Sequence, residues 1–358
     1  MSIRRGHNST RVMSGTALLL AATLALAACG GSGDGDDSAN GAEDPPESGG
    51  DAAVCDVPEG YPNGPIEMIV PWSAGGGTDA VARLVANGIS DALGVQVNAV
   101  NRTGGAGVVG HQAMVDANND GQTIGLATAE IAMMHWQGLT DISHEDLTAI
   151  SQVNADQAAV TVRADSGIDS AQDLIDQIEA NPGTVVASGT AQGGIGHLAM
   201  LGMLMAADLP LDSVTWMPSD GAAPALQELV GGGIDFIVTS SIGEVASMVD
   251  AGEVVALAVM AEEPDSNFPD VPLLQDETGL DYIGGTWRGI VGPAGIDDEI
   301  VAALDCTIAQ VLETEEFEQF MADSGYSIIY QNSQDFAAFL SSEDESFGSI
   351  MESAGLTQ

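Results

Sequence analysis

The chain has 358 residues, about the length of two domains, and 45% of them are hydrophobic, which excludes an intrinsically disordered protein. It carries 53 acidic residues against 7 arginines and no lysine. Beyond residue 28, four arginines are set against all 53 acids, a formal net charge of −49. Such a surface repels phosphate, so nucleic acid and lipid headgroups are excluded as main ligands. We expect a salt-rich external medium, because an ordinary acidic secreted protein would not need to lack lysine.

The first 28 residues have the features of a signal peptide. Three arginines precede an apolar stretch at 16–28, which is too short to span a bilayer. The run Leu26–Cys29 resembles the lipobox of bacterial lipoproteins, which implies that Cys29 becomes the lipid-modified first residue of the mature protein. We predict a lipoprotein signal peptide over 1–28. Polar residues follow the arginine pair, so the general secretory route is favoured over twin-arginine export.

A flexible acidic linker is predicted at 29–57, which is rich in Gly, Ser, Asp and Pro. No later stretch is long and apolar enough to span a membrane, so we expect the folded part outside the cytoplasm, held to the cell membrane only through the lipid anchor. With Cys29 set aside, Cys55 and Cys306 are left. We predict a disulfide between them; two buried free thiols are the alternative.

The folded part alternates between predicted strands and helices. In chain order we expect a strand at 66–70, a glycine loop at 73–79 with a helix behind it, a strand at 95–100, a helix at 109–117, strands at 123–127 and 183–187, helices at 197–207 and 222–230, a strand at 234–238, a helix at 243–251, a strand at 254–261, and helices at 297–312 and 333–354. This alternation indicates an α/β fold with largely parallel sheets.

Two glycine loops, at 73–79 and 188–197, each end a strand and open a helix. Such a loop offers unpaired backbone N–H groups and the positive end of a helix dipole to an anion. The alternative is that Thr78 or Asp79 caps its helix and the glycines only turn the chain.

The pattern G-x-G-x-x-G occurs at Gly105, Gly107 and Gly110, and Glu130 follows where a ribose-binding acid would lie. Polar residues separate these glycines from the preceding strand, and a soluble nucleotide would be lost outside the cell, so a dinucleotide site is disfavoured. The sequence contains no G-x-S-x-G, H-E-x-x-H or C-x-x-C motif, and its histidines lack ligand spacing. We predict no catalytic residue, metal or cofactor.

The segment YPNGPIEMIVPWSAGGGTDAVAR at 61–83 resembles the opening of the tripartite tricarboxylate transporter substrate-binding proteins, the Bug or TctC-like family. Further similarities follow in order at 101–107, 120–123, 189–198, 221–232, 251–258 and 287–295. The resemblance extends from about residue 61 to residue 312, and its N-R-x-G-x-x-G segment accounts for the glycine pattern without a nucleotide.

The resemblance implies an α/β, two-domain, type II periplasmic-binding-protein-like fold with the ligand cleft between lobes. Lobe 1 is expected at 58–158 and 283–358, and lobe 2 at 159–282. The implied function is an extracytoplasmic solute-binding protein that does no chemistry and delivers a small carboxylate to a permease with a large and a small integral-membrane subunit. We expect a monomer. The alternatives are a secreted, lipid-anchored enzyme acting on a small carboxylate and a lipid-tethered scaffold.

The same resemblance implies ligand-binding residues on both lobes. They are Ser73, Gly75, Gly76, Gly77, Thr78 and Asp79 in one loop, Ser188, Gly189, Thr190, Gly194 and His197 in the other, Thr128, Ala129 and Glu130 in a segment that lines the cleft, and Asp220. The two loops are expected to meet around one carboxylate. Glu130 departs from the family pattern, which favours an amine-bearing or hydroxyl-bearing ligand over a tricarboxylate.

Overall fold

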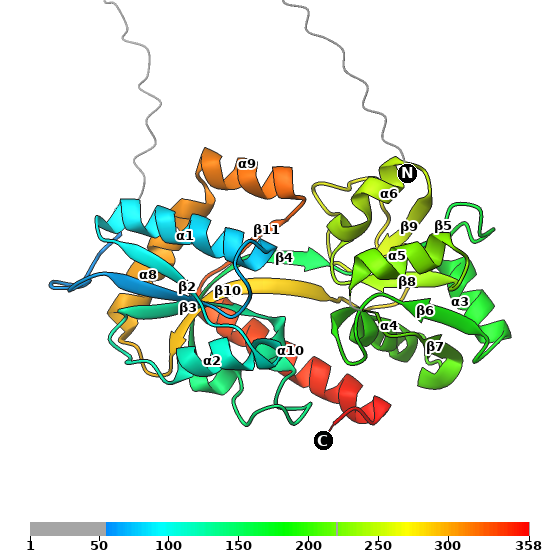
Figure 1. The fold of residues 1–358 in the computed structure, drawn as a ribbon, viewed down its shortest axis with the longest axis horizontal. Coiled ribbons are helices and arrows are strands. Elements are labelled where there is room, and N and C mark those ends of the chain that lie inside the picture. Colours follow the sequence, from blue (N-terminus) through cyan, green and yellow to red (C-terminus); the bar gives the residue numbers. More distant parts are fainter. Residues whose placement is uncertain (1–54, 220, 358) are drawn as a thin grey trace, which may run out of the picture. The chain divides into compact units, whose positions relative to one another are not determined.

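A computed structural model describes residues 55–219 and 221–357 of the chain. The predicted signal peptide at 1–28, the lipidation site Cys29, most of the linker at 29–57, and Asp220 lie outside the described residues. The described residues form a six-stranded and a five-stranded sheet with helices packed against them (Figure 1).

The first sheet has the strand order β11-β4-β10-β3-β1-β2. Strand β1 runs parallel to β2 and β3, whereas β10 runs antiparallel to β3 and β4, and β11 runs antiparallel to β4. The strands are β1 (Ile66–Val70), β2 (Val97–Asn101), β3 (Thr123–Thr128), β4 (Leu147–Gln157), β10 (Gly285–Pro293) and β11 (Ile328–Gln331).

The second sheet has the order β7-β6-β8-β5-β9. Strand β6 runs parallel to β7 and β8, and β5 runs antiparallel to β8 and β9. The strands are β5 (Ala159–Arg163), β6 (Val185–Ser188), β7 (Val214–Trp216), β8 (Phe236–Thr239) and β9 (Val254–Val259).

The chain leaves the first sheet through Ala158, which directly joins β4 to β5, and returns to it along β10. Gly285 of β10 pairs with Gln157 of β4, so the chain leaves and re-enters at the same end of the sheet. Two strands connected in this way must run antiparallel. The expectation of largely parallel sheets is therefore wrong, since five of the nine strand pairs are antiparallel.

The strands of the first sheet all fall within 58–158 or 283–358, and those of the second all fall within 159–282. We propose these segments as lobe 1 and lobe 2, and the two names are used in that sense below.

Helices α1 (Gly77–Leu93) and α8 (Asp298–Leu312) pack against each other and against strands of the first sheet. In α1, Val81, Val85 and Ile89 recur at helical spacing and are fully buried, so burial of one apolar face accounts for this helix. The other helices are α2 (Val108–Val115), α9 (Glu315–Ser324) and α10 (Ser333–Ala354) in lobe 1, and α3 (Ala171–Ala180), α4 (Ile195–Ala206), α5 (Ala222–Val230), α6 (Ala246–Asp250) and α7 (Leu274–Thr278) in lobe 2. Within the described residues, no helix has the length and apolar character needed to cross a membrane.

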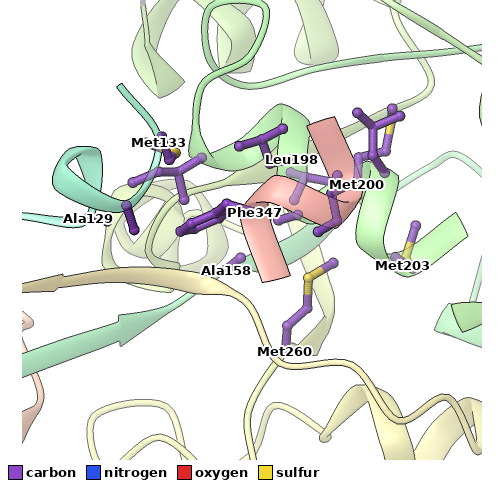
Figure 2. Close-up of a cluster of buried hydrophobic side chains, with 14 of the residues drawn as sticks. Ala129, Met133, Ala158, Leu198, Met200, Met203, Met260 and Phe347 are labelled. Carbon is purple, nitrogen blue, oxygen red and sulfur yellow. The ribbon is translucent and has the colours of Figure 1, made fainter. Parts of the chain in front are cut away.

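An apolar core rich in methionine connects the two lobes. Helix α10 of lobe 1 packs against α4 of lobe 2, which is hydrophobic on all sides and buried along nearly its whole length. Figure 2 shows Phe347 of α10 in one cluster with Leu198 and Met200 of α4 and with Ala129 and Met133 of lobe 1. The lobes therefore share a continuous hydrophobic contact in addition to their chain connections.

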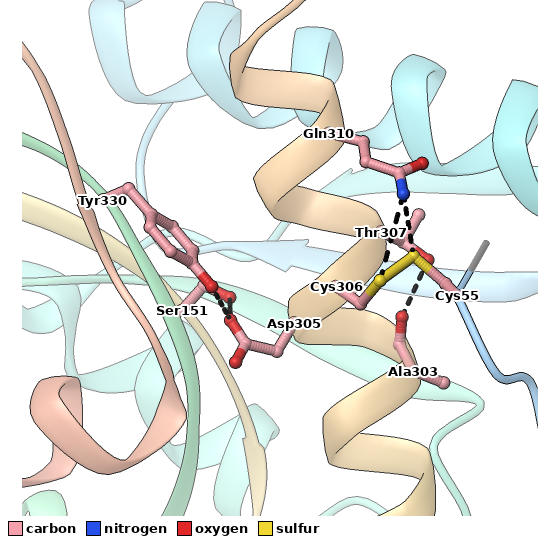
Figure 3. The surroundings of a disulfide bond; sticks show 8 residues. All are labelled: Cys55, Ser151, Ala303, Asp305, Cys306, Thr307, Gln310 and Tyr330. Atoms are coloured by element: carbon pink, nitrogen blue, oxygen red, sulfur yellow. Dashed lines mark hydrogen bonds between the residues drawn. A yellow bond between two sulfur atoms is a disulfide. The ribbon is translucent and has the colours of Figure 1, made fainter. Parts of the chain in front are cut away.

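Cys55 and Cys306 are joined by a disulfide, as the cysteine count predicts (Figure 3). The bond ties the first described residue to the middle of α8. The side chain of Gln310, one turn further along α8, donates a hydrogen bond to the sulfur of Cys55 at 3.2 Å.

Several predicted elements coincide with the structure and one does so only in part. The strand at 66–70 and the helices at 222–230 and 333–354 are confirmed. The helix predicted at 243–251 is confirmed only in its second part: a 3-10 turn, η5 (Ile242–Val245), comes first and is followed by the short α6. The Ser241 hydroxyl accepts the N–H of Gly243 and holds the tighter turn.

Candidate functional site

A cavity of about 430 Å³ lies between the two lobes. Its lining combines side chains from the ends of lobe 1 strands with the first residue of α4 and with the loop that follows β8. The lining residues are Trp72, Thr78, Thr128, Glu130, Asp156, Thr286, Arg288, Ser324 and Tyr326 of lobe 1 and Ile195, Ser240, Ser241, Gly243 and Glu244 of lobe 2.

One wall of the cavity is a directed chain of hydrogen bonds. The indole N–H of Trp72, which follows β1, donates to the hydroxyl of Thr128 at 3.2 Å. An indole nitrogen can only donate, so the Thr128 hydroxyl accepts this bond and turns its own hydrogen toward Glu130. Thr128 accordingly donates to the Glu130 carboxyl, and this fixes Glu130 as an acceptor at the cavity surface.

His111 supports this wall from behind. It is fully buried, and its Nε2 accepts the backbone N–H of Thr128 at 3.3 Å. Its Nδ1 therefore carries the hydrogen and donates to the carbonyl of Gly107 at 2.9 Å. Burial lowers the pKa of His111 to about 4, so the ring is neutral at physiological pH.

The glycines of the G-x-G-x-x-G pattern serve this packing. Gly107 has φ 95°, a conformation that favours glycine. A side chain at Gly110 would place its Cβ 2.4 Å from Cα of Pro71, so glycine allows α2 to pack close to the end of β1. These contacts account for the pattern without a nucleotide.

Arg288 of β10 joins four segments at the cavity. Its guanidinium donates to the side chain of Asn154 and, at 3.2 Å, to the carboxylate of Asp156. Its Nε donates to the hydroxyl of Thr78 at 3.2 Å, and its guanidinium carbon lies 5.0 Å from the ring centre of Tyr326. The Arg288 and Asp156 side chains are 11% and 2% exposed, so this is a buried ion pair.

The pKa values of two lobe 1 carboxyl groups at the cavity are shifted by opposing effects. Burial raises the pKa of Glu130, while the bond from Thr128 and the charge of Arg288 act in the opposite direction. Burial also raises the pKa of Asp156. The backbone N–H of Ser327, which donates to Oδ1 of Asp156 at 2.9 Å, and the charge of Arg288 both act to lower it.

The start of α1 is organised by Asp79. Its Oδ2 accepts the N–H of Gly75 at 2.8 Å, and its Oδ1 accepts the side-chain amide of Asn101 at 2.8 Å. Arg83 pairs with the same carboxylate at 2.9 Å and, as the main cause, lowers the pKa of Asp79 to about 2. Asp79 therefore holds the loop in place and does not line the cavity, whereas Thr78, one residue earlier, does.

The second glycine loop is shaped by contact with β8. Gly189 has φ 155°, and a Cβ there would lie 1.9 Å from the carbonyl oxygen of Val238. Thr190 accepts the N–H of His197 through its hydroxyl at 3.3 Å, and His197 Nδ1 accepts the N–H of Gly193 at 3.0 Å. These bonds hold the first turn of α4, where Ile195 lines the cavity.

Three of the predicted ligand-binding residues, Thr78, Thr128 and Glu130, line the cavity. The others are not among its lining residues: Ser73, Gly75, Gly76, Gly77, Asp79, Ala129, Ser188, Gly189, Thr190, Gly194 and His197. Asp220 lies outside the described residues. The starts of α1 and α4 thus reach the same cavity through Thr78 and Ile195, and the glycines of the two loops do not line it.

Sequence reasoning missed the other lining residues: Trp72, Asp156, Ile195, Ser240, Ser241, Gly243, Glu244, Thr286, Arg288, Ser324 and Tyr326. One signal was available for Arg288, which is one of only four arginines beyond residue 28. Another was the spacing of Ser241 and Glu244, since a serine followed three residues later by glutamate is typical of a capping box, and the structure contains one there.

Gly243, in the same loop as Ser241 and Glu244, lines the cavity and lies close to the C-terminal end of α9. A Cβ at Gly243 would lie 3.0 Å from the carbonyl oxygen of Gly325, which ends α9 in lobe 1.

Within the described residues, no cluster of three or more His, Cys, Asp or Glu side chains is arranged to hold a metal ion.

Two mixed sheets with a polar cavity between them define a periplasmic-type solute-binding protein, and comparison with known proteins agrees. Residues 81–356 match the family model described as "Tripartite tricarboxylate transporter family receptor". The chain therefore belongs to this family, and the expected α/β, two-domain binding-protein fold is confirmed.

Individual relatives show how far the similarity extends. Protein BugT of Bordetella pertussis is 26% identical over 302 residues, which cover 82% of this chain and 90% of BugT. The ligand-free crystal structure of a TctC solute-binding protein from Polaromonas has a TM-score of 0.76 at 29% identity and covers 82% of this chain and 99% of that one. MatC of Rhodopseudomonas palustris, with bound malate, has a TM-score of 0.63 at 22% identity, covers 81% and 99% of the two chains, and shows the shared fold.

Proposed function

We propose that this protein captures a small carboxylate outside the cytoplasm and delivers it to a tripartite tricarboxylate-type permease with a large and a small integral-membrane subunit. In this proposal it performs no chemistry, acts as a monomer and is held to the membrane by a lipid on Cys29. The observation that carries it is the cavity between the lobes, where the Arg288 guanidinium and the starts of α1 and α4 reach one space. The malate in the related MatC supports a carboxylate as the class of ligand.

The chemistry of these groups suits a carboxylate. Helices α1 and α4 have 17 and 12 residues, and the N–H groups of their first turns carry partial positive charge. A guanidinium adds planar donors that match a carboxylate. Because the chain as a whole is strongly negative, an anion must be held by such local donors and gains nothing from long-range attraction.

The adjacent glycines Gly76 and Gly77 provide a matched test. A Cβ at Gly77 would lie 2.1 Å from the hydroxyl of Tyr326, which lines the cavity, whereas a Cβ at Gly76 meets nothing closer than the carbonyl oxygen of Ser73 at 3.5 Å. Gly77→Ala must therefore displace a cavity residue, and Gly76→Ala need not.

We expect calorimetric titration in molar salt with a panel of small carboxylates, including malate, to identify at least one that binds. Gly77→Ala should weaken its binding at least about tenfold, while Gly76→Ala stays within about threefold of the parent. The proposal is wrong if no carboxylate binds to the folded protein. Equal loss of affinity in the two variants would remove the cavity as the binding site.

A further inference from the structure

The charges around the cavity do not balance. Its lining holds three carboxyl groups, those of Glu130, Asp156 and Glu244, and a single basic side chain, that of Arg288. Arg288 is already paired with Asp156 at 3.2 Å. Within the described residues, neither Glu130 nor Glu244 forms a salt bridge with a basic side chain. Two acidic groups therefore face the cavity without an ion pair of their own, and the single positive charge of Arg288 acts on all three carboxyl groups.

Both unpaired carboxyl groups are held as acceptors. Glu130 receives the hydroxyl hydrogen of Thr128, whose direction is fixed by the indole of Trp72. Glu244 receives the backbone N–H groups of Ser240 at 2.9 Å and Ser241 at 3.2 Å, and both bonds fall on its Oε2. Bonds from such donors orient a carboxylate, and they leave the second oxygen of Glu244 without a hydrogen bond in the described part of the chain.

A ligand with two or three carboxylates would fit this lining poorly. One carboxylate can be held by Arg288 and the starts of α1 and α4, but each further one would lie in a small cavity with Glu130 and Glu244. Like charges brought together in such a cavity repel, and the repulsion is stronger at Glu130, which is partly buried, than at Glu244, which is exposed. A protonated amine in that place would donate to the two acceptors and supply the missing positive charge.

We infer that the ligand is an amino carboxylate, with its carboxylate toward Arg288 and its cationic nitrogen recognised by Glu130 and Glu244. The inference rests on the proposed function and narrows its ligand class. It also separates the two options that Glu130 leaves open in the sequence, because a hydroxyl group brings no positive charge to a lining with three carboxyl groups and one guanidinium.

The test compares ligands that differ only in the amine. Calorimetric titration in molar salt would use butyrate against 4-aminobutyrate, succinate against aspartate, and glutarate against glutamate. We expect the amino member of at least one pair to bind at least about tenfold more tightly than its partner. Equal or tighter binding of the amine-free members in all pairs would overturn the inference.

Substitution then assigns the preference to residues. Glu130→Gln and Glu244→Gln keep the shape and a hydrogen-bonding oxygen but remove the charge, so either should reduce the amino preference several-fold. Glu263→Gln, an exposed acid outside this cavity's lining, is the matched control and should leave it unchanged. An unchanged preference in both cavity variants, each checked for a parent-like melting temperature, would also overturn the inference.

The two proposals fail in different ways. If amine-free carboxylates bind and their amino partners do not, the inference on the ligand class is wrong and the carboxylate-binding function stands. If no member of any pair binds and malate does not bind either, both proposals are wrong.

Discussion

Arg288 connects parts of the chain that are far apart in sequence. Its partners Thr78 and Asp156 are 210 and 132 residues away, and its guanidinium also lies over the ring of Tyr326. The paired carboxylate of Asp156 is almost completely buried. Loss of the guanidinium would leave that carboxylate buried without its counter-charge, which is the costly way to break an ion pair.

We therefore predict that Arg288→Met lowers the free energy of unfolding by about 3 to 5 kcal/mol. Urea denaturation at constant high salt would measure it. The double variant Arg288→Met with Asp156→Asn is the control, and it should be less destabilised than the sum of the two single variants, because the buried charge is gone. A loss below about 1 kcal/mol for Arg288→Met would contradict a buried pair.

The neutral ring of His111 predicts a pH dependence. Its pKa is lowered from 6.5 to about 4 by burial, so between these values the unfolded chain binds more protons than the folded one. The contribution of His111 to stability is therefore fully present above pH 6.5 and is lost as the pH falls toward 4. NMR of the ring nitrogens at pH 5 should show a neutral His111 imidazole with its hydrogen on Nδ1. If the His111 ring instead titrates near pH 6.5, it is not buried as described.

At the scale of elements, strands β4, β5 and β10, which lie next to the connections between the lobes, escaped prediction. Strand β4 contains Ser151, Gln152, Asn154 and Asp156, all buried, so its sequence lacks the apolar alternation expected of a strand. Three of them have partners far away in sequence: Ser151 bonds Asp305, Asn154 bonds the carbonyl of Ser327, and Asp156 accepts the N–H of Ser327. A local pattern does not report such tertiary contacts.

The disulfide gives a prediction for the element that it anchors. It joins residues 251 positions apart, and cross-linking the unfolded chain over a loop of this size stabilises the fold by about 2 to 5 kcal/mol. Cys306→Ser should lower the melting temperature of the exported protein, and reduction should lower that of the parent by a similar amount.

Mass spectrometry provides the direct control. The unreduced parent should be two hydrogen atoms lighter than the reduced chain. Replacement of Gln310, beside the sulfur of Cys55, by Glu should leave the bond closed. Two thiols open to alkylation in the unreduced protein would disprove the bond.

For the whole molecule, the net charge of −49 beyond residue 28 predicts salt-dependent folding. Raising the salt concentration from 0.1 M to 1 M shortens the Debye length from about 10 Å to about 3 Å and removes most of the self-repulsion. We expect the melting temperature to rise by on the order of 10 °C over this range and then to level off. An unchanged melting temperature would refute the expectation of a salt-rich medium.

The fold was more accessible from sequence than the site. Motifs near Trp72 and Gly107 indicate the family and hence the two-lobed fold. Thr78, in the first of these motifs, and Thr128 and Glu130, in a further segment similar to the family, line the cavity. Arg288 reaches the same cavity only because β10 pairs with β4, which sets it opposite Asn154. That register is a property of the folded sheet, so the central cation of the site could not be assigned beforehand.

The position of the disulfide determines how a pulling force would enter the molecule. Any tension in the chain before Cys55 passes through the sulfur bridge into α8, and from there into the first sheet against which α8 packs. Lobe 2 is not part of this direct path. It is reached through the crossing segments, the apolar contact of α4 with α10, and hydrogen bonds such as those of Ser327 with Asp265 at 3.0 Å and of Gln137 with the carbonyl of Gly193 at 2.9 Å. A pull on the N-terminus would therefore act on lobe 1 directly and on lobe 2 through these contacts.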